Sequence, residues 1–276
     1  MHEKLTLPPK CHGRCWRHEP HGRLYHWHHH DEPEFNLVVR GTARYLLGDR
    51  RYDLGPGCLV WLFPRQEHVL TELSDDFVCW ISVIRPTPLR RAARGPTYSS
   101  LRAADPPGHF CKRLVAADMT LLTALCRDVA TQQDPQRFNL GNLHLFLAAW
   151  EAFTRAPDLP DPQRLHPAVE RAVALISADP ETELTAVARR AGLSASRLSR
   201  LFHRQVGQTL VAWRVRVRLE RFLGLRRKHP QRTLLALALT AGFGSYAQFH
   251  RTFRTAMGVG PGQWGHMETP TSSTLS

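Results

Sequence analysis

Three histidines at alternate positions, His26, His28 and His30, have the residue type and spacing of a metal site. On a strand, alternate side chains project from one face, so these neutral imidazoles can converge on one divalent ion. The run is internal and interrupted by another residue type, which excludes an expression tag. A polar rim on a barrel would give the same pattern without a metal. Cys11 and Cys15 can add ligands from an N-terminal arm, although a free arm is the simpler interpretation.

The second half of the chain has the charge of a protein that binds a polyanion. Residues 1–160 contain 20 Lys and Arg against 17 Asp and Glu, whereas residues 161–276 contain 17 against 7. Lys228 is the only lysine in this second part, and guanidinium groups suit bidentate recognition of phosphate and guanine. A solvated basic face with no specific ligand is the alternative explanation.

This basic half contains an internal repeat with an offset of 50 residues. The segment 188–193 matches the segment 238–243, and an amphipathic helix is predicted after each. In both copies a small alanine lets two helices approach, and a glycine, Gly192 or Gly242, supplies the left-handed conformation that a sharp turn needs. Residues 213–227 predict one long helix that holds the two helix-turn-helix units at a fixed separation.

The apolar anchors of the two predicted recognition helices identify the face that each presents to DNA. The polar residues opposite these anchors are Ser196, Arg197, Ser199, Arg200 and His203 in the first helix, and Tyr246, Ala247, His250 and Arg251 in the second. Arg200 and Arg251 are expected at base edges or flanking phosphates. The arginines expected to be phosphate contacts or solvated charges are Arg204, Arg214, Arg216 and Arg254.

Short strands are predicted across residues 35–84. Runs rich in β-branched and aromatic residues, interrupted by turns at 48–51 and 55–57, indicate a β-barrel or sandwich. From about residue 109 the apolar period changes to three and four, which predicts two helices on either side of Asp134 and Pro135. These helices can pair between subunits or cap the barrel, and we favour dimerisation.

The patterns divide the 276 residues into two domains. An N-terminal all-β barrel with an arm is expected over residues 1–108, followed by the helical pair over 109–155 and a proline-rich linker over 156–166. An all-α domain with two helix-turn-helix units follows over 167–268, and a polar tail over 269–276. The six cysteines form no disulfide framework and no stretch of about 18 apolar residues occurs, so a cytoplasmic protein is expected.

Four segments of the basic half, 192–202, 218–220, 241–243 and 249–253, resemble the DNA-binding domain of the AraC family of bacterial transcription regulators and occur in that family's order. The resemblance covers about residues 166–265. It implies two recognition helices that enter successive major grooves on one face of the duplex.

The histidine-rich segment resembles the first cupin motif through Gly22, His28, His30, Glu34 and Gly41. The second cupin motif is matched more loosely, by Gly57, Pro64 and His68, and Gln66 stands where the motif has glycine. The resemblance covers about residues 20–85 and implies a cupin-like barrel, which is the effector-binding domain expected in front of an AraC-type DNA-binding domain. By this resemblance His28, His30, Glu34 and His68 are the ligands of a divalent metal such as zinc, iron, manganese or nickel.

We therefore expect a ligand- or metal-responsive transcription regulator rather than an enzyme, which binds double-stranded DNA sequence-specifically through two recognition helices. Its expected partners are DNA, a small-molecule or metal effector, RNA polymerase for an activator, and a second copy of the chain, but no membrane. The alternative is a metal-dependent cupin enzyme, a dioxygenase or an isomerase, fused to a DNA-binding domain. A purely architectural DNA binder would leave the barrel without a role.

Overall fold

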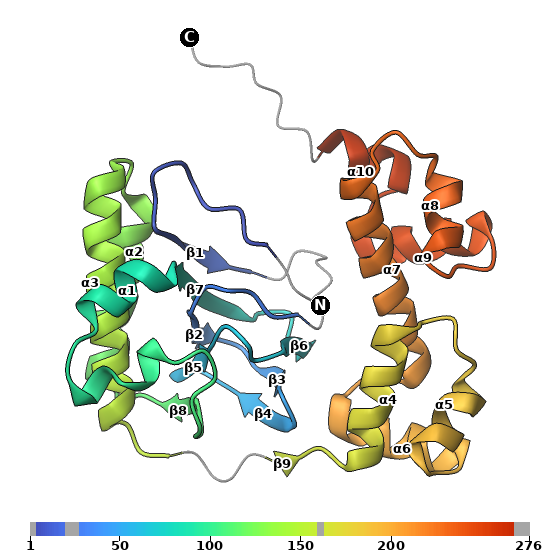
Figure 1. The fold of residues 1–276 in the computed structure, drawn as a ribbon, viewed down its shortest axis with the longest axis horizontal. Coiled ribbons are helices and arrows are strands. Elements are labelled where there is room, and N and C mark those ends of the chain that lie inside the picture. The colour runs from blue at the N-terminus through green and yellow to red at the C-terminus, as the bar shows by residue number, and fades with distance from the viewer. Residues whose placement is uncertain (1–3, 20–27, 159–162, 268–276) are drawn as a thin grey trace. The chain divides into compact units, whose positions relative to one another are not determined.

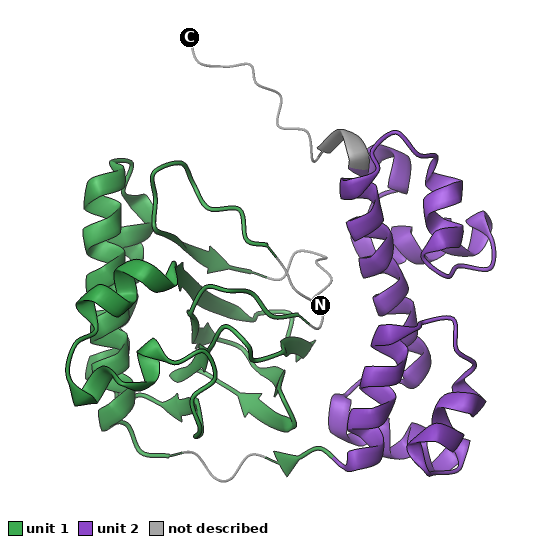
Figure 2. Ribbon diagram, viewed as in Figure 1, with its two compact units in different colours: residues 1–20, 27–165 green, residues 21–26, 166–276 purple. Residues whose placement is uncertain are grey.

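The chain folds into two compact units. The computed structural model describes residues 4–19, 28–158 and 163–267. The first unit ends at Leu165 and the second begins at His166 (Figure 2). Gly22 and His26 of the histidine-rich segment, residues 159–162 of the expected linker and the expected tail at 269–276 lie outside the described residues.

The first unit is rich in β-structure, as predicted. Hydrogen bonding joins its strands into two antiparallel sheets with the orders β1-β7-β2-β5-β8 and β6-β3-β4-β9 (Figure 1). The strands are β1 (Gly13–His18), β2 (Glu34–Arg40), β3 (Ala43–Leu47), β4 (Arg50–Leu54), β5 (Cys58–Leu62), β6 (His68–Leu73), β7 (Val78–Ile84), β8 (Cys111–Arg113) and β9 (Gln163–Arg164). Three short helical segments connect β7 to β8: α1 (Pro86–Ala92), η1 (Pro96–Tyr98) and η2 (Ser100–Arg102).

The expectation of a free N-terminal arm around Cys11 and Cys15 is wrong. Residues 13–18 form β1, which pairs with β7 along its full length at the edge of the larger sheet. Both cysteines are buried, and the Cys15 thiol donates to the carbonyl of Cys126 at 3.7 Å. Pairing satisfies backbone groups of β7 that would otherwise be left open at a sheet edge, which gives a physical reason for the segment to join the sheet.

A pair of helices covers the five-stranded sheet. The helices α2 (Ala116–Thr131) and α3 (Pro135–Arg155) flank Asp134 as predicted, and the Asp134 side chain accepts from the backbone N–H of Arg137 at 2.8 Å. Their apolar faces pack on the sheet, where the Trp61 ring lies 5.7 Å from Phe146 and 5.1 Å from Trp150 between centroids. The helix pair therefore caps the β-structure, which was one of its two predicted roles.

Strand β2 is buried on both faces, because one face packs toward the helices α2 and α3 and the other toward β3. Phe35 and Leu37 belong to the core beneath the helices. The alternate residue Asn36 points the other way and donates to the Tyr45 hydroxyl of β3 at 3.4 Å. The face of β2 that carries Glu34 and Asn36 therefore looks away from the helices.

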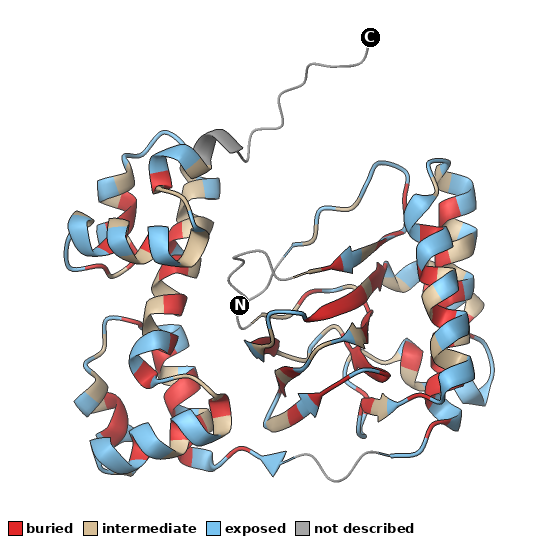
Figure 3. Ribbon diagram, turned by 180° about the vertical axis from the view of Figure 1, so that it is seen from behind, coloured by how far each residue is buried: buried red, intermediate tan, exposed pale blue. Residues whose placement is uncertain are grey.

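The second unit is entirely helical, as predicted. Its helices are α4 (Pro167–Ala178), α5 (Leu184–Ala191), α6 (Ala195–Val206), α7 (Leu210–Lys228), α8 (Leu234–Thr240), α9 (Tyr246–Met257) and α10 (Pro261–Met267). Each of the helices α4 to α9 buries residues on one side and exposes residues on the other (Figure 3). No helix within the described residues combines the length and apolarity needed to cross a membrane.

Both helix-turn-helix turns have the predicted construction. Gly192 has φ +81° and Gly242 has φ +95°, so each adopts the left-handed conformation that ends the first helix of its unit. Ala188 and Ala238 are fully buried, as expected for small residues that let two helices approach. Thr233 caps α8 by accepting from the N–H of Ala236 at 3.2 Å, whereas α5 has no side-chain cap.

Two glycine substitutions should shift stability in opposite directions. Gly192→Ala should lower the free energy of unfolding by about 1 kcal/mol, because alanine is strained at a left-handed φ. Gly224→Ala in the interior of α7, where an added Cβ meets nothing within 4 Å, should raise it by about 0.5–1 kcal/mol. Chemical denaturation of the full chain measures both. Equal effects of the two changes would contradict the assignment of the turn.

Candidate functional site

Three histidine rings converge in the first unit. His28, His30 and His68 each offer one nitrogen, and these three atoms lie within 4.8 Å of one another. The ring centroids are 4.2 Å apart for His28 and His68, 5.3 Å for His30 and His68, and 5.8 Å for His28 and His30. Three imidazoles that converge in this way can hold a divalent ion such as zinc.

Backbone pairing places two of these rings opposite each other. The N–H of His28 donates to the carbonyl of His68 at 3.2 Å, and the N–H of His68 donates to that of His28 at 2.8 Å. His68 is the first residue of β6, and among residues 28–30, which the structure describes, His28 forms an isolated bridge to it and not a regular strand. A single bridge is nevertheless enough to bring the two side chains to one place.

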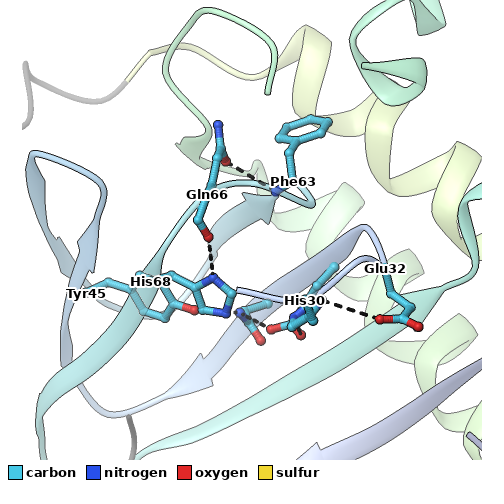
Figure 4. Close-up of polar contacts among 8 residues, drawn as sticks. His30, Glu32, Tyr45, Phe63, Gln66 and His68 are labelled. Atoms are coloured by element: carbon cyan, nitrogen blue, oxygen red, sulfur yellow. Dashed lines mark hydrogen bonds and ion pairs between the residues drawn. The ribbon is translucent and has the colours of Figure 1, made fainter. Parts of the chain in front are cut away.

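The tautomer of His68 is fixed by the residue that replaces the motif glycine. His68 Nδ1 donates to the backbone carbonyl of Gln66 at 2.9 Å, which leaves Nε2 as the nitrogen with the lone pair (Figure 4). The Gln66 amide oxygen accepts from the N–H of Phe63 at 3.2 Å, and its amide nitrogen donates to Asp105 at 3.0 Å. The loop before β6 is thus held in the conformation that orients His68.

Glu34, which the cupin resemblance implies as a fourth ligand, does not belong to the cluster of converging atoms. One of its oxygens lies 3.1 Å from His30 Nε2, and the other accepts from Asn36 at 2.9 Å. Burial lowers the pKa of His30, but the hydrogen bond to Glu34 and the charges of Glu34 and Glu32 outweigh this, so that the pKa of His30 is raised. In this geometry the Glu34 carboxylate contacts the His30 ring and is not one of the groups that converge in the histidine cluster.

Two polar residues near the cluster were not predicted from sequence. Asn36 is buried and bonds to Glu34, and Tyr45 stacks on His68 with ring centroids 6.1 Å apart. Burial and the charge of Glu34 raise the pKa of Tyr45 well above its usual value, so its hydroxyl stays protonated. A signal for Asn36 was present, because it lies two residues beyond Glu34 on the same face of β2.

In the second unit, α6 exposes every residue predicted to meet DNA. Leu198 and Phe202 are fully buried and fix the orientation of the helix. The side chains on the opposite surface are exposed, namely those of Ser196, Arg197, Ser199, Arg200, His203 and Arg204. The N-terminus of α6 is capped by Ser194, whose hydroxyl accepts from the N–H of Arg197 at 3.4 Å.

Helix α9 has the same construction with a mixed surface. Phe249 and Phe253 are fully buried, and the exposed residues include Ala247, Arg251 and Arg254. Tyr246 and His250 are only half-buried, with ring centroids 6.1 Å apart. The prediction omitted Gln248, which is exposed in the first turn and accepts from the N–H of Gly244 at 3.1 Å.

The long helix α7 connects the two helix-turn-helix units. At 1.5 Å per residue its 19 residues span about 28 Å, somewhat less than one turn of B-form DNA at about 34 Å. The α5–α6 and α8–α9 pairs lie beside α7, one toward each of its ends (Figures 1 and 3). Both candidate recognition helices therefore belong to helix pairs that pack beside the same long helix, α7.

Arg216 of α7 was expected to be a phosphate contact or a solvated charge, and this is wrong. Its side chain is buried, and its Nε donates to Glu220 one turn later at 3.1 Å. Its guanidinium carbon also lies 5.3 Å from the centroid of the Trp213 ring. Helical periodicity places Arg216 on the same face as Leu219, which is the face that packs inward.

Four arginines of the candidate DNA surface have no carboxylate partner within the described residues. Arg197 and Arg200 on α6 and Arg251 and Arg254 on α9 are exposed and make no ion pair there. Their charge is not neutralised by the fold, so it is available to a polyanion.

Family models match both parts of the chain. The model described as an AraC-like ligand binding domain matches residues 13–194, and the model described as a helix-turn-helix domain matches residues 187–267. No curated protein matches the chain.

Several solved structures are similar at low identity. ToxT from Vibrio cholerae is 15% identical over 94% of this chain and 98% of its own, with a TM-score of 0.39. The C-terminal domain of AraT, a response regulator from Geobacillus stearothermophilus, is 25% identical over 41% of this chain and 95% of its own, with a TM-score of 0.37. A transcriptional regulator from Chromobacterium violaceum is 24% identical over 38% of this chain and 96% of its own, with a TM-score of 0.35.

Proposed function

The chain belongs to the AraC family of ligand-responsive, DNA-binding transcription regulators, and from this premise we propose that α6 and α9 read the DNA sequence while the first unit binds the effector. It is a regulator and not an enzyme, so the alternative of a cupin enzyme with a DNA-binding appendage is set aside. For an activator, RNA polymerase would be a further partner of the DNA-bound protein.

The single observation that carries the DNA-binding proposal is the exposed arginine surface on two helices of matched construction. Arg200 and Arg251 lie opposite buried phenylalanines, at equivalent places in the two repeats. A helix that buries one side must present the other, and an unpaired guanidinium there can donate two hydrogen bonds to guanine. Arg197, Arg204 and Arg254 supply phosphate contacts that position the helices without specifying sequence. The other proposed contacts are Ser196, Ser199, His203, Tyr246, Ala247 and His250.

Removing one reading arginine should weaken specific binding. On a duplex selected from a random pool, Arg200→Ala and Arg251→Ala should each raise the Kd by about 10-fold or more, because a bidentate base contact contributes about 1–3 kcal/mol. Fluorescence anisotropy measures the Kd, and the matched control is Arg90→Ala, an exposed arginine of the first unit. Log affinity should also fall against log salt with a slope of magnitude about 5 or more.

Unchanged affinity of both recognition-helix variants on selected and scrambled duplexes would remove these residues from the interface. A flat salt dependence would remove the phosphate contacts.

For the effector end of the molecule, we propose that His28, His30 and His68 hold a divalent metal ion. The proposal rests on three converging nitrogens, on the fixed lone pair of His68 and on the carboxylate of Glu34 against His30. A carboxylate that bonds to a ligating imidazole fixes the ring and strengthens it as a ligand, so Glu34 is proposed as an orienting residue. A three-histidine ion also keeps a coordination position open for an effector.

Metal analysis tests this proposal directly. Protein purified without a nickel column and dialysed against zinc should retain about one equivalent, and His28→Ala or His68→Ala should reduce this to below about 0.1 equivalent, because each removes one of three ligands. His144→Ala, which removes an exposed histidine of α3, is the control and should leave the metal content unchanged. Wild-type protein that itself retains less than about 0.1 equivalent would contradict the proposal. Responsiveness additionally requires that the Kd for DNA differ between the two metal states.

We further propose that α2 contributes a dimer interface. Its inner face covers the sheet, but Val115 and Leu121 are 57% and 52% exposed at its start and on its outer side. Leu121→Glu should convert a dimer to a monomer in sedimentation, because a carboxylate is costly at a dry interface. Leu239→Glu changes a comparably exposed leucine of α8 and should leave the mass unchanged. A wild-type chain that sediments as a monomer at micromolar concentration would rule the interface out.

A further inference from the structure

A cleft at one end of the helix pair is not used by the proposed metal or DNA sites. It has a volume of about 790 Å³ and is bounded by the segment that leads into β1, by α1 and by the start of α3. This volume lies within the range of about 300–1,000 Å³ that is usual for small-molecule sites. Its lining includes the apolar residues Pro88, Ala92, Leu140 and Leu143, and the Leu140 side chain is 64% exposed to solvent.

The lining of the cleft also includes two cationic side chains. Lys10 and Arg91 belong to different elements, and neither makes an ion pair within the described residues. The one carboxylate of the lining, Asp134, is already engaged as the cap of α3. Two cations against one anion leave the cleft with a single positive charge, which suits a singly charged anion better than a dianion.

The segment that carries Lys10 is held in place by two hydrogen bonds to one side chain of α3. The Asn139 side chain accepts from the N–H of His12 at 2.6 Å and donates to the carbonyl of Lys10 at 3.1 Å. Lys10 has φ +63°, and it is the only residue other than glycine with a positive φ among those that the structure describes. A lysine rarely adopts this backbone conformation, because it is strained. Such strained residues cluster at ligand-binding sites, where the surrounding contacts hold them.

We propose that this cleft binds an organic monocarboxylate with an apolar body. Arg91 receives the carboxylate, since a guanidinium can donate two parallel hydrogen bonds to it, while Lys10 adds a second positive charge. The apolar body covers Leu140 and Leu143. The proposal deepens the effector-binding role of the first unit and rests on that proposed function.

Calorimetric titration of the full chain with 4-phenylbutyrate, in the absence of DNA, tests the proposal. Wild-type protein should bind one molecule per chain, and the neutral 4-phenylbutanamide should bind at least about 10-fold more weakly, because it lacks the charge that Arg91 pairs with. Arg91→Gln should weaken 4-phenylbutyrate by about 10-fold and abolish the preference for acid over amide. Arg90→Gln alters the neighbouring arginine, which does not line the cleft, and should stay within about 2-fold of wild type.

A second variant separates the apolar contribution from folding. Leu140 is exposed, so Leu140→Ser should leave the chain folded and should weaken both probes to a similar degree. Absence of saturable binding to wild type, equal effects of the two arginine changes, or an unchanged Arg91→Gln variant would each overturn the proposal. So would a lower sedimenting mass for Leu140→Ser, because a second copy of the chain would then be what covers the cleft. The Arg200→Ala variant should bind 4-phenylbutyrate as wild type does, so a failure here is distinguishable from a failure of the DNA-binding proposal.

Discussion

Burial of aromatic side chains against α7 is the interaction on which the whole second unit depends. Phe222 of α7 lies 4.4 Å from Phe249 of α9 between ring centroids, and Trp213 lies 6.0 Å from Phe202 of α6. These contacts fix the rotation of each recognition helix about its own axis. Once that rotation is fixed, helical periodicity directs the arginines outward. The exposed arginine faces of α6 and α9, which are the proposed DNA surface, are thus a consequence of this packing.

Burial of aromatic side chains also fixes the orientation of strand β2 in the first unit. Phe35 packs between Trp61 and Phe146 in the core beneath α3, at centroid distances of 5.4 and 5.2 Å. Because side chains alternate along a strand, this directs Glu34 and Asn36 to the opposite face. Glu34 then meets His30, so the polar site depends on an apolar core from which it is separated by the thickness of one strand.

How much of the candidate metal site could be predicted depended on how far its residues are separated in sequence. His28 and His30 are neighbours in an evident motif, and His68 was identified through a second, looser motif. Tyr45 was not identified, and Gln66 was noted only as a departure from the motif, because their roles come from a ring stacked across a sheet and from a loop carbonyl. Glu34 was given the role of a ligand because spacing alone does not show that its oxygens bond to His30 and Asn36.

Sequence by itself determined the order of the two domains, the repeated turn glycines and the polar faces of α6 and α9, because each of these follows from local conformation and short-range periodicity. Tertiary structure decided which charges are available. Arg216 has the same residue type as Arg200, yet the first is buried beside Trp213 and the second is exposed. Tertiary structure likewise turned an expected arm into β1. The burial of Arg216 and the pairing of β1 both depend on residues that are distant in the chain. Their backbone groups and apolar surfaces must be covered, and a local sequence pattern does not show which segment covers them.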